Sequence, residues 1–434
     1  MTEQVQGFLN FIDNAPSTFH AVDTMIAQLK AKGFERLNEH EDWKLVPGGK
    51  YYVTRNLSSI MAFSVPKDGF DHFQIVASHS DSPTFKLKPT CENSVCEKFV
   101  RLNIEKYGGM VLHTWVDRPL SIAGRVVVRE GNSFTTHLVD LDKTIMIPNV
   151  AAHLNRQLND GFKYNPQVDM QPMYGDITAK GKLMEDVAEA AGVKAEQIVT
   201  CDLSLYCSQP GIVWGRDDVY FSCSRIDDLE CAYTSLMGFI DAEPVGHVNV
   251  CAVFDNEEVG STSKQGAAST FLTDVLMRTA AAFGMTDAQT RAAIVSSFMV
   301  SADNAHSVHP KHPEMYDAQN RTYMNEGVVI KSNANQSYTS DGISSAIFKT
   351  ICEAANVPAQ LFSNRSDMRG GGTLGNIALN HASMNSVDIG LPQLAMHSAY
   401  ETAGVKDIDY MIDALKKFYE TCIVVENDGA YTLK

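Results

Sequence analysis

The stretch from Val248 to Gly266 reads VNVCAVFDNEEVGSTSKQG. Its first seven residues have the apolar character of a buried β-strand, and three acids follow within four positions: Asp255, Glu257 and Glu258. Charged groups are rarely buried unless they are paired or bind a metal ion. Either these acids belong to a solvated turn, or the strand delivers two adjacent carboxylates to a site where they do chemistry.

Length and composition describe an ordinary globular chain. It has 434 residues, 44% of them hydrophobic and 20% charged, which is enough for a large core and more than one domain. No run of 18 apolar residues is present, and the acidic, polar start lacks the features of a signal peptide, so we expect no membrane span and a cytoplasmic location. The net charge of −16 argues against a nucleic-acid partner.

Nine cysteines are scattered singly along the chain, and no C-x-x-C pair occurs. This odd number and this spacing argue against a disulfide framework and against a thiolate zinc finger. Reduced thiols fit the pattern better, and any metal site should draw on other side chains.

Strand-like and helix-like runs alternate in the first and last thirds of the chain. This alternation predicts an α/β fold with a mostly parallel sheet and helices on both faces. The middle third has short strand patterns separated by turn residues and lacks that rhythm. We therefore expect a catalytic domain in two parts, 1–90 and 221–434, interrupted by an inserted β-rich domain at 91–220.

Polar residues follow several of the predicted strands. His79, Asp303 and the pair Glu257–Glu258 each come after a strand-like run, Asp227 lies at a helix start, and His397 follows the last predicted strand. In open α/β sheets, ligands bind outside the carboxyl ends of the strands, so these distant residues should converge at one edge.

Taken singly, these residues have simpler explanations. Asp227 suits a helix N-cap, His79 suits a hydrogen-bonded core histidine, and the adjacent glutamates suit a solvated turn. Their joint placement favours a metal site, because two histidines and several carboxylates are ligands suited to Zn²⁺ or a neighbouring divalent ion.

Several longer motifs resemble a known family. They are ASHSDSPTFKLKP (77–89), SRIDDL (224–229), FDNEEVGS (254–261), SADNAHSVHP (301–310) and AMHSAYE (395–401), joined by APSTFHAV (15–22) and IPNVAAHLNR (147–156). In this order and nearly end to end, they resemble the motifs of aspartyl aminopeptidases and the related vacuolar-type aminopeptidases.

The resemblance implies two zinc ions per chain, for which Co²⁺ or Mn²⁺ can substitute. Asp227 would bridge both ions. His79 and Asp303 would complete the ligands of one ion, and Glu258 and His397 those of the other.

The resemblance also implies a mechanism, in which a zinc-bridged hydroxide attacks the peptide and Glu257 acts as general base without binding metal. Asp81 would orient His79 through a carboxylate–histidine contact. In the wider group of such enzymes the peptide bond after the bridging aspartate is often cis, so a cis bond between Asp227 and Asp228 is possible here.

The implied activity is removal of the N-terminal residue from peptides, with Asp or Glu the expected residue. Lys331 matches a lysine that faces the acidic side chain of the substrate, and His306 is a second candidate for substrate contact. The glycine-rich segment 366–376 differs from the version in aspartyl-specific members. A neutral-residue, leucine-type preference therefore stays open.

The family resemblance further implies that the inserted domain mediates dimerisation and that dimers build a tetrahedral dodecamer. His153 would then reach into the active site of a neighbouring subunit; the alternative is a histidine buried within its own domain or interface. Two other functions remain open: a metallo-carboxypeptidase or deacylase with the same metal centre, and a non-enzymatic scaffold that has kept the fold.

Overall fold

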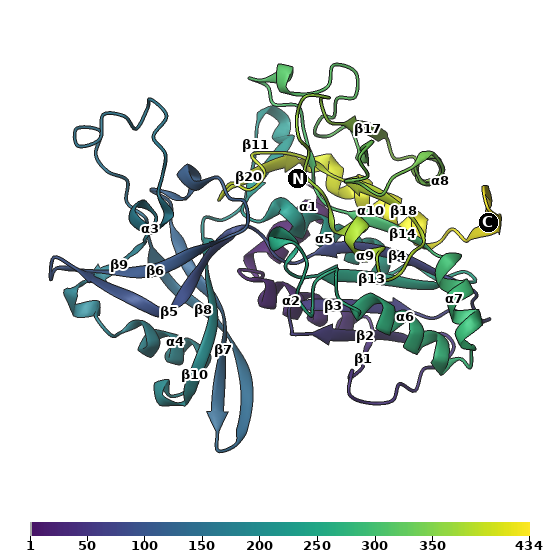
Figure 1. The fold of residues 1–434 in the computed structure, drawn as a ribbon, viewed down its shortest axis with the longest axis horizontal. Coiled ribbons are helices and arrows are strands. Elements are labelled where there is room, and N and C mark those ends of the chain that lie inside the picture. Colours follow the sequence, from purple (N-terminus) through teal and green to yellow (C-terminus); the bar gives the residue numbers. More distant parts are fainter. Residues whose placement is uncertain (1) are drawn as a thin grey trace.

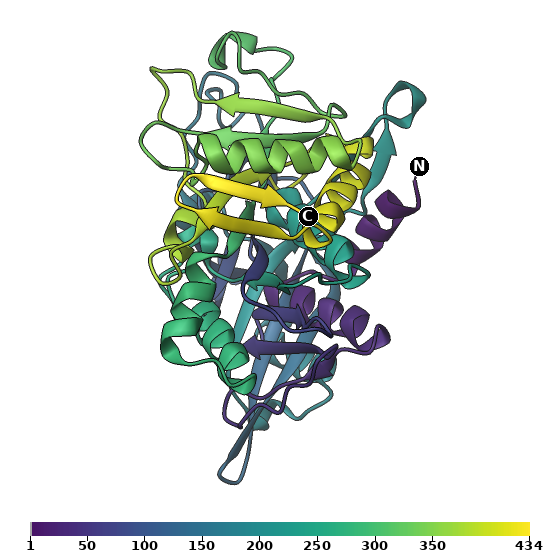
Figure 2. The ribbon, with the colours of Figure 1, turned by 90° about the vertical axis from the view of Figure 1, so that its right-hand side faces the viewer.

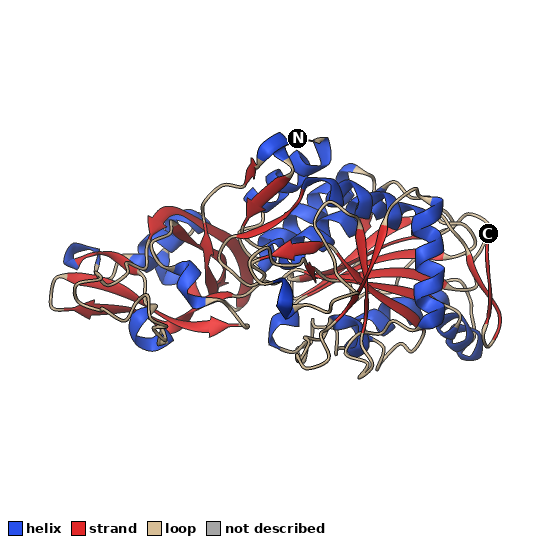
Figure 3. Cartoon of the chain, turned by 90° about the horizontal axis from the view of Figure 1, so that it is seen from above, coloured by secondary structure: helices blue, strands red, loops and turns tan. Residues whose placement is uncertain are grey.

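The structure, a computed structural model, describes residues 2–434. An α/β body carries both termini, and a β-rich body projects from it (Figure 1). Seen from above, the central sheet of the α/β body lies between layers of helices, and the two bodies meet over a narrow region (Figure 3).

Nine strands form the central sheet. In spatial order they are β1 (Glu35–Arg36), β2 (Lys50–Arg55), β3 (Ser59–Ser64), β13 (Val248–Phe254), β4 (Phe73–His79), β14 (Phe298–Ala302), β18 (Asn385–Gly390), β16 (Val328–Ser332) and β17 (Ala359–Ser363). The four strands β13, β4, β14 and β18 run parallel. Every residue of β13 and β4 is buried, as expected for strands covered on both faces.

Helices cover both faces of this sheet. On one face lie α1 (Glu3–Asp13), α2 (Thr18–Ala31), α5 (Ile226–Ile240), α8 (Gly342–Ala354) and α10 (Val405–Tyr419); on the other lie α6 (Phe271–Ala282), α7 (Asp287–Val295) and α9 (Leu374–Ala378). Alternate strand residues point to opposite cores: Val76 and Val253 pack under the first group, Ile75 and Ala252 under the second.

A second sheet forms the β-rich body. Its strands, in spatial order, are β8 (Ser133–Ile145), β7 (Leu120–Glu130), β10 (Ile198–Cys207), β5 (Thr84–Val95), β6 (Phe99–Tyr107) and β9 (Met173–Asp176), and all of them pair antiparallel. The helix α4 (Leu183–Ala191) contributes Leu183 and Val187 to its separate core, and α3 (Pro166–Asp169) is a single turn.

Smaller elements complete the fold. A five-stranded sheet contains β11 (Ile212–Trp214), β12 (Tyr220–Cys223), β20 (Glu401–Gly404), β19 (Pro392–Leu394) and β15 (Ala305–His306). The chain ends in a hairpin of β21 (Ile423–Asn427) and β22 (Ala430–Leu433), which faces the viewer in Figure 2. The described residues also contain six short 3₁₀ helices: η1 (Leu112–Trp115), η2 (Ile177–Ala179), η3 (Ala195–Gln197), η4 (Arg216–Asp218), η5 (Glu257–Val259) and η6 (Pro313–Met315).

The α/β class and the helices on both faces agree with the prediction, but "mostly parallel" holds only for the central sheet, where β1–β2, β16–β17 and the strands from β13 to β18 pair parallel. β3 is antiparallel to both neighbours, β16 is antiparallel to β18, and the second sheet is wholly antiparallel. The tight turn between β2 and β3, where Asn56 and Leu57 have φ of 59° and 57°, joins the two strands as a hairpin and so makes them antiparallel.

The prediction that His397 follows the last strand was wrong. It lies between β19 and β20, and two further strands follow at the C-terminus, because these strands are short and lack a clear alternation of polar and apolar residues. The division at residues 90 and 220 stays a prediction; the second sheet begins at Thr84. Among residues 2–434, no helix is both long and apolar enough to cross a membrane.

Candidate metal centre

Three parallel strands deliver polar residues to one edge of the central sheet. In the register of β13 and β4, Phe254 pairs with His79, and β14 lies on the other side of β4. The acidic turn after β13 and Asp303, directly after β14, therefore emerge beside His79, at the carboxyl ends of the strands.

The start of α5 supplies the central residue of the site. Asp227 is 3% exposed and has non-helical φ and ψ angles, and the peptide bond that joins it to Asp228 is cis. The hydroxyl of Ser82 donates a hydrogen bond to the carbonyl oxygen of Asp227 at 2.7 Å. The Asp227 backbone N–H donates to Glu401 at 3.1 Å.

Two groups of candidate ligands share Asp227. One contains His79, Asp227, Asp228 and Asp303, and the other contains Asp227, Glu258 and His397; within each group the ligand atoms lie within 4.8 Å of one another. His79 Nε2 is 3.5 Å from Asp227 Oδ1. His397 Nε2 is 3.2 Å from the other oxygen, Asp227 Oδ2, and 3.4 Å from Glu258 Oε1. Asp227 thus has one oxygen for each group.

Several buried carboxylate oxygens in the site lack hydrogen bonds, which is evidence that these residues fit a metal. Asp227 Oδ1, Asp228 Oδ1 and Glu258 Oε1 are buried and have no hydrogen-bond partner among the described residues. Leaving such groups buried and unpaired costs free energy. Cations held between imidazole and carboxylate ligands would satisfy them, and this ligand set suits zinc.

The protonation of the site reflects its crowded carboxylates. Burial alone would lower the pKa of His397, but the carboxylates of Asp227 and Glu258 outweigh it and raise the pKa to about 10. The carboxylates therefore stabilise positive charge within the site, and bound cations can supply that charge in place of protons.

Glu257 lies in the 3₁₀ turn η5, and it forms a third close group with His79 and Glu258. Burial, reinforced by the carboxylates of Asp303 and Asp227, raises the pKa of Glu257 to about 8. A carboxyl group that titrates near neutral pH has the property that proton transfer requires.

Asp81 holds this turn in place. Its carboxylate accepts hydrogen bonds from the backbone N–H groups of Glu257 at 3.1 Å and Glu258 at 3.2 Å, and from the hydroxyl of Tyr107 at 2.6 Å. His79 Nδ1 lies 3.0 Å from the carbonyl oxygen of Asp81 and 3.4 Å from its carboxylate. The ring of His79 therefore lies nearer to the backbone carbonyl of Asp81 than to its carboxylate, and the carboxylate supports the two glutamates.

Two candidate substrate contacts line the same pocket as the metal centre. Lys331 is 3% exposed; its Nζ donates to the carbonyl oxygen of Asn304 at 3.0 Å and lies 3.8 Å from Asp303 Oδ1. His306 is exposed, and its ring centroid is 6.2 Å from that of Phe362. Both residues border the pocket that contains Asp227 and the glutamates.

His153 does not join this site within one chain. It is an exposed residue of the long loop between β8 and α3, and it is not among the residues that line the pocket. In Figure 1 that loop extends from the β-rich body on the side away from the central sheet.

Sequence reasoning missed two supporting residues. Glu401 is buried and accepts hydrogen bonds from the backbone N–H groups of Asp227 and His397, so it couples one end of the site to the other. Tyr107 supports Asp81 from the second sheet. Glu401 is the last residue of the motif AMHSAYE, so its closeness to His397 in the sequence could have indicated a role in the site. No feature of the sequence indicated a role for Tyr107.

Known proteins similar to this chain are zinc metalloproteases and aminopeptidases. A family described as "Aminopeptidase I zinc metalloprotease (M18)" matches residues 11–419. A probable M18 family aminopeptidase 2 of Clostridium novyi is 44% identical over 420 residues, which are 95% of this chain and 97% of that protein. A probable aspartyl aminopeptidase of Ricinus communis is 35% identical, with 95% of this chain and 94% of that protein covered.

Solved structures show the same fold. A cryo-EM structure of the Ape4 and Nbr1 complex contains a chain that is 33% identical, with a TM-score of 0.93, covering 96% of this chain and 85% of that one. A structure of the mApe1 dodecamer of S. cerevisiae gives 25% identity and a TM-score of 0.85, with 96% of each chain covered. The family match spans nearly the whole sequence, and the chain therefore belongs to the M18 family of zinc metalloproteases, the aminopeptidase I family.

Proposed function

We propose that this M18 aminopeptidase removes N-terminal acidic residues, Asp or Glu, from peptides by means of two zinc ions per chain. The observation that carries the dinuclear proposal is the position of Asp227, whose two carboxylate oxygens face two separate groups of candidate ligands. His79 and Asp303 would hold one ion, and Glu258 and His397 the other. Co²⁺ or Mn²⁺ can occupy the same oxygen and nitrogen ligands.

When bound, zinc supplies a Lewis acid that polarises the scissile carbonyl and lowers the pKa of water to about 7. The chain's own contribution is proton transfer and positioning. Glu257 accepts the proton of the attacking water and passes it to the leaving amine. Asp81 fixes Glu257 for this task through the backbone hydrogen bond described above.

Lys331 supports the acidic preference. Its ammonium group borders the pocket beside Asp303, and a charged pair with a substrate carboxylate gains strength where water is excluded. The relative from Ricinus communis carries the name probable aspartyl aminopeptidase.

A neutral-residue preference is the second candidate. It is favoured by the contacts that already engage Lys331, a hydrogen bond to the carbonyl of Asn304 and an ion pair with Asp303, because an ammonium group already paired with a carboxylate attracts a substrate carboxylate less strongly. Gly371 and Gly372 of the glycine-rich segment line the same pocket, so this segment also contributes to the choice.

Assembly through the β-rich body forms part of the proposal. Large apolar side chains are exposed there, among them Leu154 at 83%, Val150 and Phe99, and exposed apolar patches mark interaction surfaces. We propose that these surfaces pair two chains, that dimers build the dodecamer, and that His153, one residue before Leu154, enters the neighbouring active site. The mApe1 relative was solved as a dodecamer.

The aminopeptidase activity is tested with one peptide sequence in two forms, one with a free N-terminus and one N-acetylated. The proposal expects release of the first residue only from the free peptide. Cleavage of the acetylated peptide, or release from the C-terminus, would point to a deacylase or a carboxypeptidase. No cleavage of either form by metal-loaded protein would favour a scaffold.

A further inference from the structure

A second cluster of potential ligands lies at the opposite ends of the strands that form the metal centre. His72 and His247 each directly precede a core strand, β4 and β13 respectively. The parallel register pairs Phe73 with Val248, and the Val248 N–H donates to the carbonyl oxygen of His72 at 3.1 Å. The two imidazole rings consequently lie side by side, with centroids 5.3 Å apart.

The hydrogen bonds of the two rings leave one nitrogen of each without a partner. His72 Nδ1 lies 2.6 Å from Asp71 Oδ1, and His247 Nε2 lies 3.0 Å from the carbonyl oxygen of Tyr419. A carboxylate and a carbonyl can only accept, so in each neutral ring these nitrogens carry the proton. His72 Nε2 and His247 Nδ1 then have free lone pairs, and both atoms are buried without a partner among the described residues.

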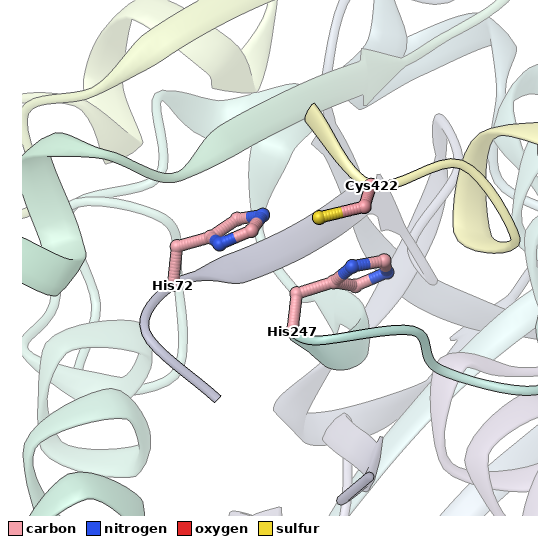
Figure 4. Close-up of side chains that lie close together, drawn as sticks. All are labelled: His72, His247 and Cys422. Carbon is pink, nitrogen blue, oxygen red and sulfur yellow. The ribbon is translucent and has the colours of Figure 1, made fainter. Parts of the chain in front are cut away.

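The third member of the cluster comes from the C-terminal segment. Cys422 lies between α10 and the terminal hairpin, and its backbone exchanges two hydrogen bonds of 3.0 Å with Lys434. Its thiol is half-buried and forms no disulfide. Figure 4 shows the sulfur and the two imidazole rings pointing toward one another.

We propose that His72, His247 and Cys422 form a third metal site, a structural site for Zn²⁺ that is separate from the catalytic pair. Two imidazoles and a thiolate are suitable zinc ligands, and a water molecule can complete the tetrahedron on the open side of Cys422. Each histidine already has the outer partner that fixes the tautomer of a zinc-bound ring, a carboxylate for His72 and a backbone carbonyl for His247.

The spacing of the ligand atoms is compatible with this site. One ring nitrogen of each histidine and the sulfur lie within 4.8 Å of one another. Bond lengths of about 2.0 Å to nitrogen and 2.3 Å to sulfur place these tetrahedral ligand atoms roughly 3.3–3.5 Å apart. The thiol of Cys422 is the mobile member of the set, because its side chain rotates about a single bond whereas both rings are held by hydrogen bonds.

The site would fasten the end of the chain to its core. His72 and His247 belong to neighbouring core strands, whereas Cys422 begins the segment that leads to the terminal hairpin. Seven residues of extended chain separate His72 from the catalytic ligand His79, about 23 Å at roughly 3.3 Å per residue. The metal should therefore stabilise the hairpin without entering the reaction.

Cobalt distinguishes this site from the catalytic one. The full-length protein is stripped with a chelator and reloaded with Co²⁺, and the thiolate-to-cobalt charge-transfer absorption is recorded. The candidate catalytic ligands are imidazoles and carboxylates, so this absorption distinguishes a thiolate site from the catalytic centre, and the cysteine variants assign it to a residue. We expect the absorption in the wild-type protein and in Cys201→Ser, a control at another half-buried thiol, and we expect Cys422→Ser to lack it. In zinc-loaded protein, Cys422→Ser should contain one zinc ion per chain fewer than the wild type.

A second variant avoids any change to the buried ligands. The Asp71 side chain is 89% exposed, so Asp71→Asn should fold normally. The amide oxygen can still accept from His72 Nδ1, but the negative charge is lost, and Co²⁺ binding at this site should weaken about 10–100-fold, the usual effect of mutating an outer partner. Asp68→Asn, an exposed acid nearby in the same loop, should leave binding unchanged.

Three results would overturn the proposal: no thiolate absorption in the cobalt-loaded wild-type protein, an absorption that persists in Cys422→Ser, or equal zinc content in these two proteins. Peptidase activity of Cys422→Ser should stay within about twofold of wild type. If the catalytic assignment is wrong, the peptidase assay and the variants of the catalytic ligands will contradict it while the thiolate absorption remains. The two proposals can therefore fail independently.

Discussion

Asp81 Oδ1 lies 3.1 Å from the backbone nitrogen of Glu257, so the carboxylate that contacts a candidate zinc ligand also positions the candidate base. The same side chain binds the backbone of Glu258. One buried acid thereby ties the end of β4 to the turn that follows β13.

Asp81→Asn should disrupt this turn, because an amide NH₂ cannot accept a hydrogen bond from a backbone N–H. We expect kcat to fall about 10–100-fold, the usual effect of losing a group that orients ligands. Steady-state kinetics with parallel zinc analysis measures this. Tyr107→Phe removes a donor to Asp81 and the acceptor for the Asn256 side chain but keeps the contact of Asp81 with Glu257, so it should have a smaller effect. Equal losses in both variants would contradict a special role for the contact with Glu257.

Lys331→Met should change residue preference. If the ammonium group binds an acidic side chain, the wild-type protein cleaves Asp and Glu substrates faster than Leu substrates, and the variant reverses that order. A panel of aminoacyl chromogenic substrates gives kcat/KM for each residue. Lys349→Met, at an exposed lysine of α8, serves as the control. A wild-type preference for Leu substrates would exclude specificity for acidic residues. The glycine-rich segment 366–376 would then be the first candidate for setting the preference.

Glu230→Gln should alter the pH dependence of stability. Burial raises the pKa of Glu230 well above its ordinary value, against the hydrogen bond from Asn304. A carboxyl group whose pKa is higher in the folded state stabilises the fold fully below its unfolded pKa of about 4.3, and loses that contribution as pH rises through the folded pKa.

The glutamine variant stays neutral and keeps an acceptor for Asn304. Its Tm should match wild type near pH 4 and exceed it by at least about 2 °C at pH 9. Thermal unfolding across this range measures the difference, and Glu353→Gln, at an exposed position of α8, should show no such trend. A constant Tm difference at all pH values would contradict the role assigned to burial.

His153 can be tested by subunit exchange. His153→Ala and Glu257→Gln chains should each be inactive, and a mixed dimer would have one site with both groups and one with neither. Recovery of activity on mixing, with exchange confirmed by native mass spectrometry, is the expected result. Confirmed exchange without recovery would show that His153 acts within its own chain or has no catalytic part, and a stable, active monomer in light scattering would exclude the assembly.

The central strands and their helices could be predicted because their residues are buried on both faces and read as continuous apolar runs, as in β13 and β4. The helix α1 also has a signal in the sequence, because Val5, Phe8, Leu9 and Ile12 follow a helical spacing among polar residues. The short strands around His397 have no such periodicity, and only pairing with distant segments defines them.

The candidate ligands were predictable as acids and histidines that follow strands. The residues that support them were not, because Tyr107 and Glu401 act through hydrogen bonds to segments far away in the sequence. The pairing of His72 with His247 likewise depends on the register of two strands that are separated by more than a third of the chain.

The central claim is that the turn after β13 supplies one ligand and one base. The most direct test compares zinc content and kcat in Glu257→Gln and Glu258→Gln. We predict that Glu257→Gln keeps the zinc content of the wild-type protein while kcat falls at least about 10²-fold, as expected for loss of a general base, and that Glu258→Gln loses one zinc ion per chain. Loss of zinc from Glu257→Gln, or full activity in that variant, would contradict the account.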